Sequence, residues 1–396
     1  MGNSIIIVKN KERIITCLAG EKELLTIQVD RENNSRLVGN IYLGKVKNIV
    51  KNINAAFVEI SDRQICYLPL GEVRKPVFAD GKEHAVRIGD ELIVQVVKDA
   101  TKTKAPLVTA DFSLTGKNIV LVSGSDRIGV SSKIADEEKR SSLKALTEQF
   151  RGDGFGFVVR TNAASVSEET LISETKRICG EYERIVNNAH TRSCFTRLYS
   201  APPSFIWEIR DGYSEEIDVI KTDDDEIYAQ IKDYMERMND RDLDKLILYD
   251  DKTVSLSTLY NIESQLEKAL YERVWMDSGA YLVIQPTEAL VAIDVNTGKS
   301  IAGRQDVEET FFKVNCEAAE EIGRQIRLRN LSGIIIVDFI DMKSEDHKSR
   351  LIKKLKSVLE KDRIPTHVAD MTALNLVEIT RKKIRRPLYD QIENDK

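Results

Sequence analysis

The chain has little of what marks secreted, zinc-binding or membrane-anchored proteins. Its 5 cysteines are scattered along 396 residues and include no C-x-x-C pair, which favours reduced thiols and predicts no zinc site. No basic segment precedes a long apolar run at the amino terminus, and Ile6 stands where a myristoylation signal has Ser or Thr. No segment is apolar over the length of a membrane-spanning helix. We therefore expect a cytoplasmic protein without membrane contact.

The chain also lacks an excess of positive charge. Charged residues make up 31% of it, yet the net charge is −5, so binding to a nucleic acid would depend on local basic patches. The densest patch is residues 380–386, which could clamp phosphates or could only solubilise the end of the chain. The length predicts about two to four domains, each with an adequate core.

A glycine-rich phosphate-binding loop is missing as well. Gly298-Lys299-Ser300 follows an expected strand and resembles the end of such a loop, which also needs a glycine five residues before Gly298. That position is Ile293, so no backbone N–H groups are free to surround a triphosphate. Hydrolysis of nucleotides by a P-loop is excluded, although Lys299 could contact a phosphate or could be a solvated loop residue.

Two aspartates stand out against apolar surroundings. Residues 290–296 and 334–340 have the pattern of buried strands, and Asp294 and Asp338 lie near their carboxyl ends. A carboxylate in a low-dielectric interior is costly unless a metal ion or dense hydrogen bonding compensates it. The segment between the strands has helical spacing over residues 305–326, with Gly333 as a candidate stop.

A strand–helix–strand unit would bring these aspartates together. The crossover is long enough for parallel strands, so both carboxylates are predicted at one sheet edge, where open α/β folds bind ligands. Proteins usually hold Mg²⁺ with such a pair, completed by water and substrate phosphate. Asp341 ranks as a supporting acid, and the alternative is that Asp294 and Asp338 are unrelated residues that cap loops.

Residues 39–96 predict a small closed barrel, because short β-rich pieces alternate with glycines at bends, and an OB-fold fits their number. Phe57 and Tyr67 are expected on neighbouring strands. Rings flanked by cations suit single-stranded nucleic acid, where stacking contributes about 1–3 kcal/mol per base, but both rings could equally be barrel core. The basic residues expected nearby are Lys45, Lys47, Lys102 and Lys104.

The next segment, residues 116–200, reads as a separate α/β insertion with helices over 133–150 and 167–188. Between them an apolar strand over 155–163 runs into Arg160-Thr161. A guanidinium fork beside a hydroxyl suits a terminal phosphate, but by itself this motif is weak and a surface salt bridge is the favoured explanation for Arg160. Beyond Pro202-Pro203, which marks a boundary, helices are predicted over 223–238 and 255–272.

Together these segments resemble the ribonuclease E/G family of bacterial endoribonucleases, from about Ile5 to Arg386. The most specific matches are ALVAIDVN at 289–296, DVEET at 306–310, EAAEEIGRQIRLRNLSG at 317–333 and IIIVDFIDM at 334–342.

The resemblance implies a multidomain α/β fold. An RNase H-like subdomain would comprise residues 1–35 and 204–274. Within it would lie an OB-fold RNA-binding domain over 36–115 and a 5′-sensor-like α/β domain over 116–203. A DNase I-like catalytic subdomain would follow over 275–396.

It also implies roles for individual residues. Asp294 and Asp338 would hold the catalytic Mg²⁺, which Mn²⁺ could replace, and Asn296 would orient the scissile phosphate or a metal-bound water. The matches to nucleotide-contacting positions are Phe57, Tyr67 and Lys104, and those to the sensor of a 5′-monophosphate are Gly116, Val120, Arg160 and Thr161.

The implied activity is Mg²⁺-dependent endonucleolytic cleavage of single-stranded, AU-rich RNA, in messenger and ribosomal precursors, leaving 5′-phosphate and 3′-hydroxyl ends. The alternative is a non-catalytic RNA-binding protein of the same architecture, which would have no need of Asp294, Asn296 and Asp338 together.

The sequence departs from the family pattern in three places. No C-x-x-C segment follows the basic residues 380–386, so a homodimer without a zinc link is expected. Ser132-Lys133 replaces an arginine pair, which would weaken RNA contact there. The long carboxy-terminal scaffold is missing, which favours the shorter, ribonuclease G-like type.

Overall fold

The structure, a computed structural model, describes residues 2–21, 23–31, 37–100, 104–211, 217–238, 242–298, 307–372 and 374–393. The chain forms two compact units. The first contains Met1–Asn33, Glu215–Lys232 and Asp242–Lys396, and the second contains Asn34–Ser214 and Asp233–Arg241. Each unit is described by itself.

The first unit contains a five-stranded sheet in the order β15-β14-β1-β2-β3. Its strands are β1 (Asn3–Asn10), β2 (Arg13–Ala19), β3 (Leu24–Arg31), β14 (Ile217–Thr222) and β15 (Leu246–Leu248). The β1-β2-β3 meander is antiparallel, whereas β14 runs parallel to β1 and β15. The sheet therefore joins the amino terminus to residues more than 200 positions later in the chain.

One face of this sheet packs against short helices. Its buried side chains, which include Ile15 and Val29, form a core with residues of α5 (Leu256–Leu259), α6 (Ile262–Lys268) and α9 (Leu388–Glu393). The prediction of one helix over 255–272 was wrong. Asn261, at φ 50°, separates α5 from α6, and the Leu259 side chain is 51% exposed.

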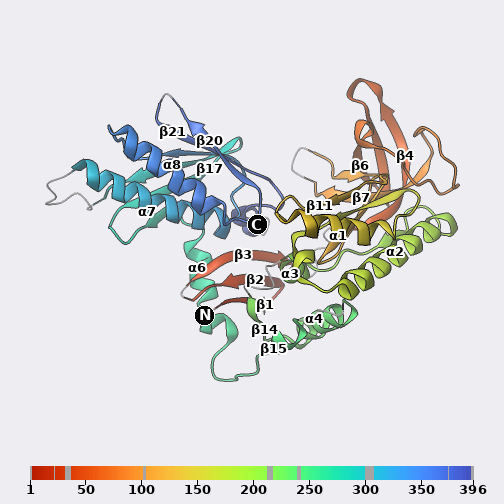
Figure 1. Cartoon of the computed structure of the whole chain (residues 1–396), viewed down its shortest axis with the longest axis horizontal. Coiled ribbons are helices and arrows are strands. Elements are labelled where there is room, and N and C mark those ends of the chain that lie inside the picture. Colours follow the sequence, from red (N-terminus) through yellow and green to blue (C-terminus); the bar gives the residue numbers. More distant parts are fainter. Residues whose placement is uncertain are drawn as a thin grey trace. The chain divides into compact units, whose positions relative to one another are not determined.

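The first unit also contains a six-stranded sheet in the order β16-β17-β18-β19-β21-β20, which we call the carboxylate sheet. Its strands are β16 (Arg273–Trp275), β17 (Tyr281–Pro286), β18 (Leu290–Asn296), β19 (Gly333–Asp338), β20 (Thr366–Met371) and β21 (Leu376–Arg381). Helices α7 (Val307–Leu328) and α8 (Glu345–Leu359) lie together over one face, which holds the core (Figure 1). The opposite face has no such helical cover in the described core.

Helix α7 ends slightly earlier than its predicted stop. Asn330 adopts φ 49° and turns the chain out of the helix, while Gly333, at φ 88°, begins β19 instead of ending the helix. The expected strand–helix–strand unit is present, since α7 connects the parallel strands β18 and β19.

The second unit contains the predicted barrel. Strands β4, β5, β6, β8 and β7 close because β4 also pairs with β7, and this five-stranded closed barrel is consistent with an OB-fold. The bounds are β4 (Ile41–Val50), β5 (Ala55–Ser61), β6 (Gln64–Pro69), β7 (Glu91–Lys98) and β8 (Leu107–Thr109), with β13 (Arg197–Tyr199) added beside β4.

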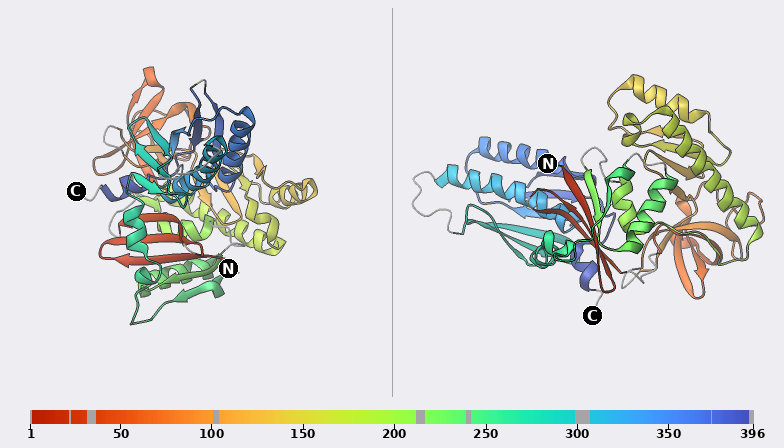
Figure 2. Two further views of the ribbon diagram at one scale, coloured as in Figure 1. Left: turned by 90° about the vertical axis from the view of Figure 1, so that its left-hand side faces the viewer. Right: turned by 90° about the horizontal axis from the view of Figure 1, so that it is seen from below.

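A four-stranded sheet and two helices form the rest of this unit's larger core (Figure 2). The strands are β9 (Ser113–Thr115), β10 (Ile119–Ser123), β11 (Ile128–Val130) and β12 (Phe155–Val159), and the helices are α1 (Glu137–Glu148) and α2 (Glu168–Thr191). Asp136 and Ser167 cap these helices through side-chain acceptors, which sets their first turns. Helix α3 (Ser204–Asp211) follows, and α4 spans Asp225–Arg237.

Candidate active site and nucleic-acid interface

The two predicted catalytic aspartates lie side by side. Strands β18 and β19 are parallel neighbours, and Asp294 is the register partner of Asp338. Both residues lie near the carboxyl ends of their strands, as the sequence predicts. Since directly paired residues of adjacent strands point to the same face, the two carboxylates share one face of the carboxylate sheet.

That face is open, so the prediction of buried carboxylates was wrong. Asp294 and Asp338 are both exposed, whereas their strand neighbours Ile293 and Val337 are buried against α7 and α8. The sequence hid this alternation because the open face of β19 also carries apolar side chains, among them Ile334, which is 50% exposed. The pair is therefore brought together by strand register and not by enclosure.

Electrostatic repulsion is visible at this pair. Partial burial, followed by the charges of Asp294 and Asp341, raises the pKa of Asp338 above its ordinary value. Asn296 donates from Nδ2 to Asp294 Oδ2 at 2.6 Å, which fixes one oxygen of that carboxylate. Asp341 lies beyond the end of β19 and accepts a hydrogen bond from Asn375 at 3.3 Å. A cation between Asp294 and Asp338 would relieve their repulsion.

The donor set fits a hard cation that keeps several waters. Among the described residues, no group of three or more His, Cys, Asp or Glu side chains is arranged to hold a metal ion. Mg²⁺ needs only one or two protein carboxylates, because water and substrate phosphates complete its octahedron. Two aspartates beside the amide of Asn296 meet that requirement, whereas a closed structural zinc site needs four ligands.

The loop after Asp338 is fastened by residues that the sequence reading missed. Asn315 on α7 is fully buried, donates to the Ile340 carbonyl at 2.8 Å and accepts from the Ile340 N–H at 3.0 Å. Glu308, in the first turn of α7, accepts hydrogen bonds from the backbone N–H groups of Lys343 and Ser344, both at 3.0 Å. The available signal was an asparagine between the core residues Val314 and Ala318, on a helix face that is mainly apolar.

Phe57 and Tyr67 form an aromatic pair on the outside of the barrel. They are cross-strand partners on β5 and β6, and their ring centroids lie 6.0 Å apart in an edge-to-face arrangement. Both side chains are half-buried, whereas the alternating neighbours Val58 and Cys66 are part of the barrel core. The alternative that both rings are barrel core is therefore wrong.

The lysines near this pair differ in availability. Lys45 pairs with Glu91 at 3.3 Å and Lys47 pairs with Glu59 at 3.1 Å, so their charges are partly compensated. Lys104 is exposed, and Lys102 lies outside the described residues. Of the three predicted cations that the structure describes, Lys104 is the strongest candidate for phosphate contact.

The structure brings together the residues predicted to sense a terminal phosphate. Arg160 follows β12 and donates from Nη1 to the Gly116 carbonyl at 2.7 Å. The Thr161 hydroxyl lies 3.0 Å from that of Ser131, at the start of the 3₁₀ helix Thr161–Ser165. Val120 is half-buried on β10, one strand away from Arg160.

Gly116 is required by its surroundings. A Cβ at this position would lie 2.0 Å from Glu174 Oε1, and that carboxylate is buried and accepts from Asn118 Nδ2 at 2.7 Å. Any side chain at Gly116 would therefore displace the acid that holds Asn118, whose carbonyl in turn accepts from the Arg160 N–H at 2.8 Å.

Arg160 also makes a salt bridge, which was the alternative to phosphate binding in the sequence analysis. Its Nη1 lies 2.8 Å from Asp211 Oδ1, and the same carboxylate receives two bonds from Arg210, at 3.0 and 2.8 Å. Burial opposes ionisation of Asp211, but the hydrogen bonds and charge of Arg210, together with Arg160, hold its pKa below the ordinary value. Within the described part of the chain the guanidinium makes its contacts through Nη1, which leaves its Nε–Nη2 edge for a bidentate anion.

The basic cluster 380–386 is only partly available. Arg381 is 5% exposed and forms a buried ion pair with Asp362 at 2.6 Å, so it holds the end of β21 and does not face solvent. Arg385 donates to Gln28 at 3.0 Å, whereas Lys382 and Lys383 are exposed. Lys299 lies outside the described residues.

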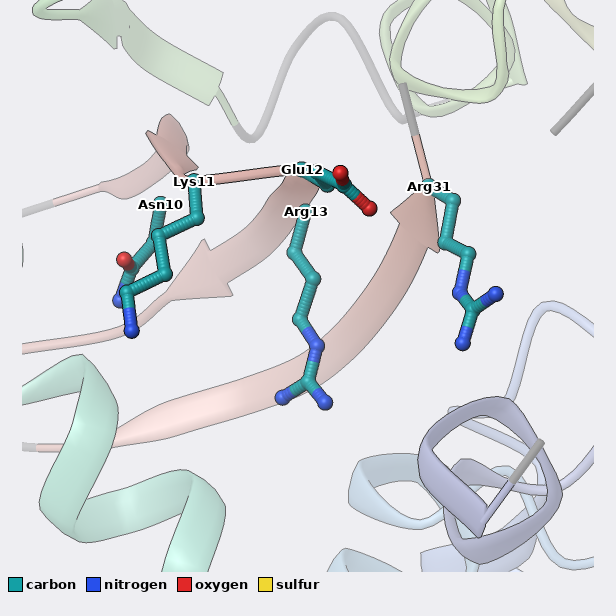
Figure 3. A pocket seen from close by; sticks show the side chains of 5 residues that line it. All are labelled: Asn10, Lys11, Glu12, Arg13 and Arg31. Carbon is teal, nitrogen blue, oxygen red and sulfur yellow. The ribbon is translucent and has the colours of Figure 1, made fainter. Parts of the chain in front are cut away.

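A cavity of about 540 Å³ lies at the end of the β1–β2 hairpin (Figure 3). Arg13 and Arg31 are direct cross-strand partners on β2 and β3 and point to the same side, with Lys11 at the turn. Both arginines make further polar interactions, so the cavity gives no sign of an unmet charge and we assign it no role.

Among the described residues, no helix is both long and apolar enough to cross a membrane.

Comparison with known proteins shows which family the chain belongs to. The family model "Ribonuclease E/G family" matches residues 113–384. Ribonuclease G of Haemophilus influenzae is 32% identical over 393 residues, which cover 96% of this chain and 79% of the relative. Ribonuclease G of Escherichia coli K12 is 33% identical over 383 residues, covering 94% and 78%. Ribonuclease E of Synechocystis is 36% identical over 363 residues, covering 90% of this chain and 54% of the relative. This chain belongs to the ribonuclease E/G family.

Proposed function

We propose that the protein is a Mg²⁺-dependent endoribonuclease that cuts single-stranded RNA and leaves 5′-phosphate and 3′-hydroxyl ends. One observation carries the proposal: Asp294 and Asp338 are register partners on the open face of a sheet, with Asn296 bonded to one of them. Partial burial and the charges of Asp294 and Asp341 raise the pKa of Asp338, and the two paired acids beside an amide have no evident structural task, because their neighbours already form the core without them.

Asp294 and Asp338 would hold the metal ion. When bound, Mg²⁺ or Mn²⁺ would supply Lewis-acid polarisation of the phosphodiester and a more acidic water. Asn296 donates to Asp294 through Nδ2, which keeps that carboxylate oriented and turns its own carbonyl oxygen away from the bond. Asn315 and Glu308 keep the chain after Asp338 in place.

RNA would bind to the barrel through its outer aromatic pair. The edge-to-face arrangement of Phe57 and Tyr67 leaves ring surface for bases to stack on, and exposed Lys104 would contact the phosphates. A 5′-monophosphate would accept hydrogen bonds from Nε and Nη2 of Arg160 and contact Thr161, beside Gly116 and Val120. RNA with a 5′-monophosphate would therefore bind more tightly than RNA with a 5′-hydroxyl.

The finer parts of the proposal follow the family. The five-stranded sheet would be the RNase H-like subdomain and the carboxylate sheet the DNase I-like one. Curated relatives are named ribonuclease G and ribonuclease E, which supports action on RNA. AU-rich messenger and ribosomal precursors as substrates, a cytoplasmic location and a homodimer are the remaining parts of the proposal.

The test is cleavage of a 5′-labelled, AU-rich single-stranded RNA with Mg²⁺, with Mn²⁺ and with chelator. Internal cuts with either metal and none with chelator are expected. Binding without cuts in all three conditions would favour the non-catalytic RNA-binding alternative. Cuts that persist undiminished in chelator would remove the metal from the proposal.

A further inference from the structure

The open face of the carboxylate sheet carries a pair of aromatic side chains, one exposed and one half-buried, beside the proposed catalytic residues. Trp275 is 61% exposed on the three-residue edge strand β16, and its cross-strand partner on β17 is Tyr281. Their ring centroids lie 5.0 Å apart. A large ring left in water at a sheet edge is unusual enough to require an explanation.

An arginine completes this cluster. The Arg273 guanidinium lies 4.5 Å from the Tyr281 ring centroid and 5.8 Å from that of Trp275. Among the described residues the Arg273 side chain contacts these two rings and forms no ion pair. We call Arg273, Trp275 and Tyr281 the edge platform.

Strand register ties the edge platform to the carboxylates. Tyr281 pairs with Asn296, and Val283, the partner of Arg273, pairs with Asp294. Because direct partners share a face, Trp275, Tyr281 and Asn296 form one row across three strands. Strands lie about 4.8 Å apart, so Trp275 is roughly 10 Å from Asn296, which is within reach of a nucleotide next to the one at the carboxylates.

We propose that the edge platform is a subsite that stacks one base of the RNA flanking the scissile phosphate. The inference rests on the proposed function, because Asp294, Asn296 and Asp338 define where that phosphate lies. Ring faces bind any base by stacking, and the positive charge of Arg273 favours a strand whose phosphates are negative. A single strand of RNA supplies a partner for both parts of the edge platform, since its bases stack on the rings and its phosphates are attracted to Arg273.

The decisive experiment combines Trp275→Ala with single-stranded substrates that lack one base at a time on either side of the cut. In the native protein, removing the base at one position should lower kcat/KM about tenfold, within the range that stacking supplies. In Trp275→Ala, kcat/KM on the intact substrate should already be lowered by this amount, and removing the same base should lower it no further. Trp275→Phe should restore most of the coupling, and Tyr271→Ala, which removes another exposed ring that lies outside the carboxylate sheet, should leave it unchanged.

A second readout does not depend on cleavage. Trp207 and Trp275 are the 2 tryptophans of the chain, so Trp207→Phe leaves Trp275 as the reporter. In chelator, single-stranded RNA should quench its fluorescence saturably, and inorganic phosphate should not. If no variant or substrate is cut but quenching persists, the proposed function fails, whereas the stacking of RNA on the edge platform stands.

Three results would overturn the subsite. Trp275→Ala could lower activity equally on every base-free substrate, which would show a structural role. Quenching could be absent while native cleavage is normal. Trp275→Ala could convert a dimer to a monomer without base-specific coupling, which would make the edge platform a contact between copies of the chain.

Discussion

Two sites of this molecule collect charge in opposite ways. At the carboxylate sheet, strand register places Asp294 beside Asp338 with Asp341 nearby, and among the described residues no cation is paired with this cluster. At the Arg160 site the charges are already balanced within the chain, because Asp211 lies between Arg160 and Arg210. A cation bound at the first site would therefore relieve repulsion, whereas an anion at the second site would have to bind through guanidinium atoms that the internal ion pair does not use.

This difference shows why the sites should respond differently to mutation. Removing one acid from the repelling pair should relieve repulsion in the free protein and, under the proposed function, abolish cleavage. Removing one partner from the satisfied pair should cost stability and, under the same proposal, change only the selectivity for the 5′ end. The following predictions use that contrast.

The largest effect is expected for Asp294→Asn. The amide keeps the shape but lowers the affinity for a divalent cation, so cleavage should fall by more than about a hundredfold, while RNA binding, measured by filter binding in chelator, should be unchanged. Asp277→Asn, which removes an exposed acid from the β16–β17 turn, is the matched control and should cut normally. Cleavage by Asp294→Asn at the native rate would show that the catalytic assignment is wrong.

The sequence could predict the pairing of Asp294 with Asp338 because parallel crossovers obey strict topological rules. It could not predict that the pair is exposed, since Ile334 and Ile336 on the open face hide the alternation of β19. Likewise the strand before Arg160 was readable, but its partner Asp211 lies 51 residues further along the chain, and nothing local marks it.

The helices show the same limit. Helix α7 was predicted closely by its apolar spacing, yet the role of Asn315 depends on Ile340, which reaches it only in the folded chain. The break between α5 and α6 follows from the left-handed conformation of Asn261, a choice that side-chain periodicity does not record.

The next largest effect is expected for Asn315→Ala. Losing both bonds to Ile340 frees the loop that follows Asp338, so kcat should fall about 10- to 100-fold and more Mg²⁺ should be needed for half-maximal rate, with KM for RNA little changed. Gln325→Ala removes another buried amide from α7 and is the control, with a comparable loss of stability and a native metal requirement. An unchanged Mg²⁺ requirement in Asn315→Ala would show that the hydrogen bonds between Asn315 and Ile340 have only a structural role.

A smaller effect is expected for Arg160→Ala. It should leave cleavage of 5′-hydroxyl RNA near the native rate and remove the advantage of 5′-monophosphate RNA, a change of about tenfold in the ratio of kcat/KM values, because charge-assisted bonds to an anion contribute about 1.5–3 kcal/mol before screening. Arg184, an exposed arginine of α2 that pairs with Glu181, offers the control Arg184→Ala, expected to keep the ratio. An equal ratio in native and Arg160→Ala protein would place the sensor elsewhere or remove it.

The smallest effect bears most directly on the contrast between the sites. The pKa of Asp211 is lowered, so its ion pairs stabilise the fold above the ordinary carboxyl value of 3.8 and stop doing so as pH falls through the lowered pKa. The pKa of Asp338 is raised, so its charge destabilises the metal-free fold above that raised value and ceases to do so as pH falls below 3.8.

At pH 7 in chelator, Asp211→Asn should therefore lower the free energy of unfolding and Asp338→Asn should raise it, each by about 1 kcal/mol or less because both groups are partly solvated. Urea unfolding at pH 7 and at pH 3 measures this, and the two shifts should have opposite signs at pH 7 and both shrink at pH 3. Shifts of the same sign at pH 7 would mean that the two sites do not differ in the way their charges are balanced.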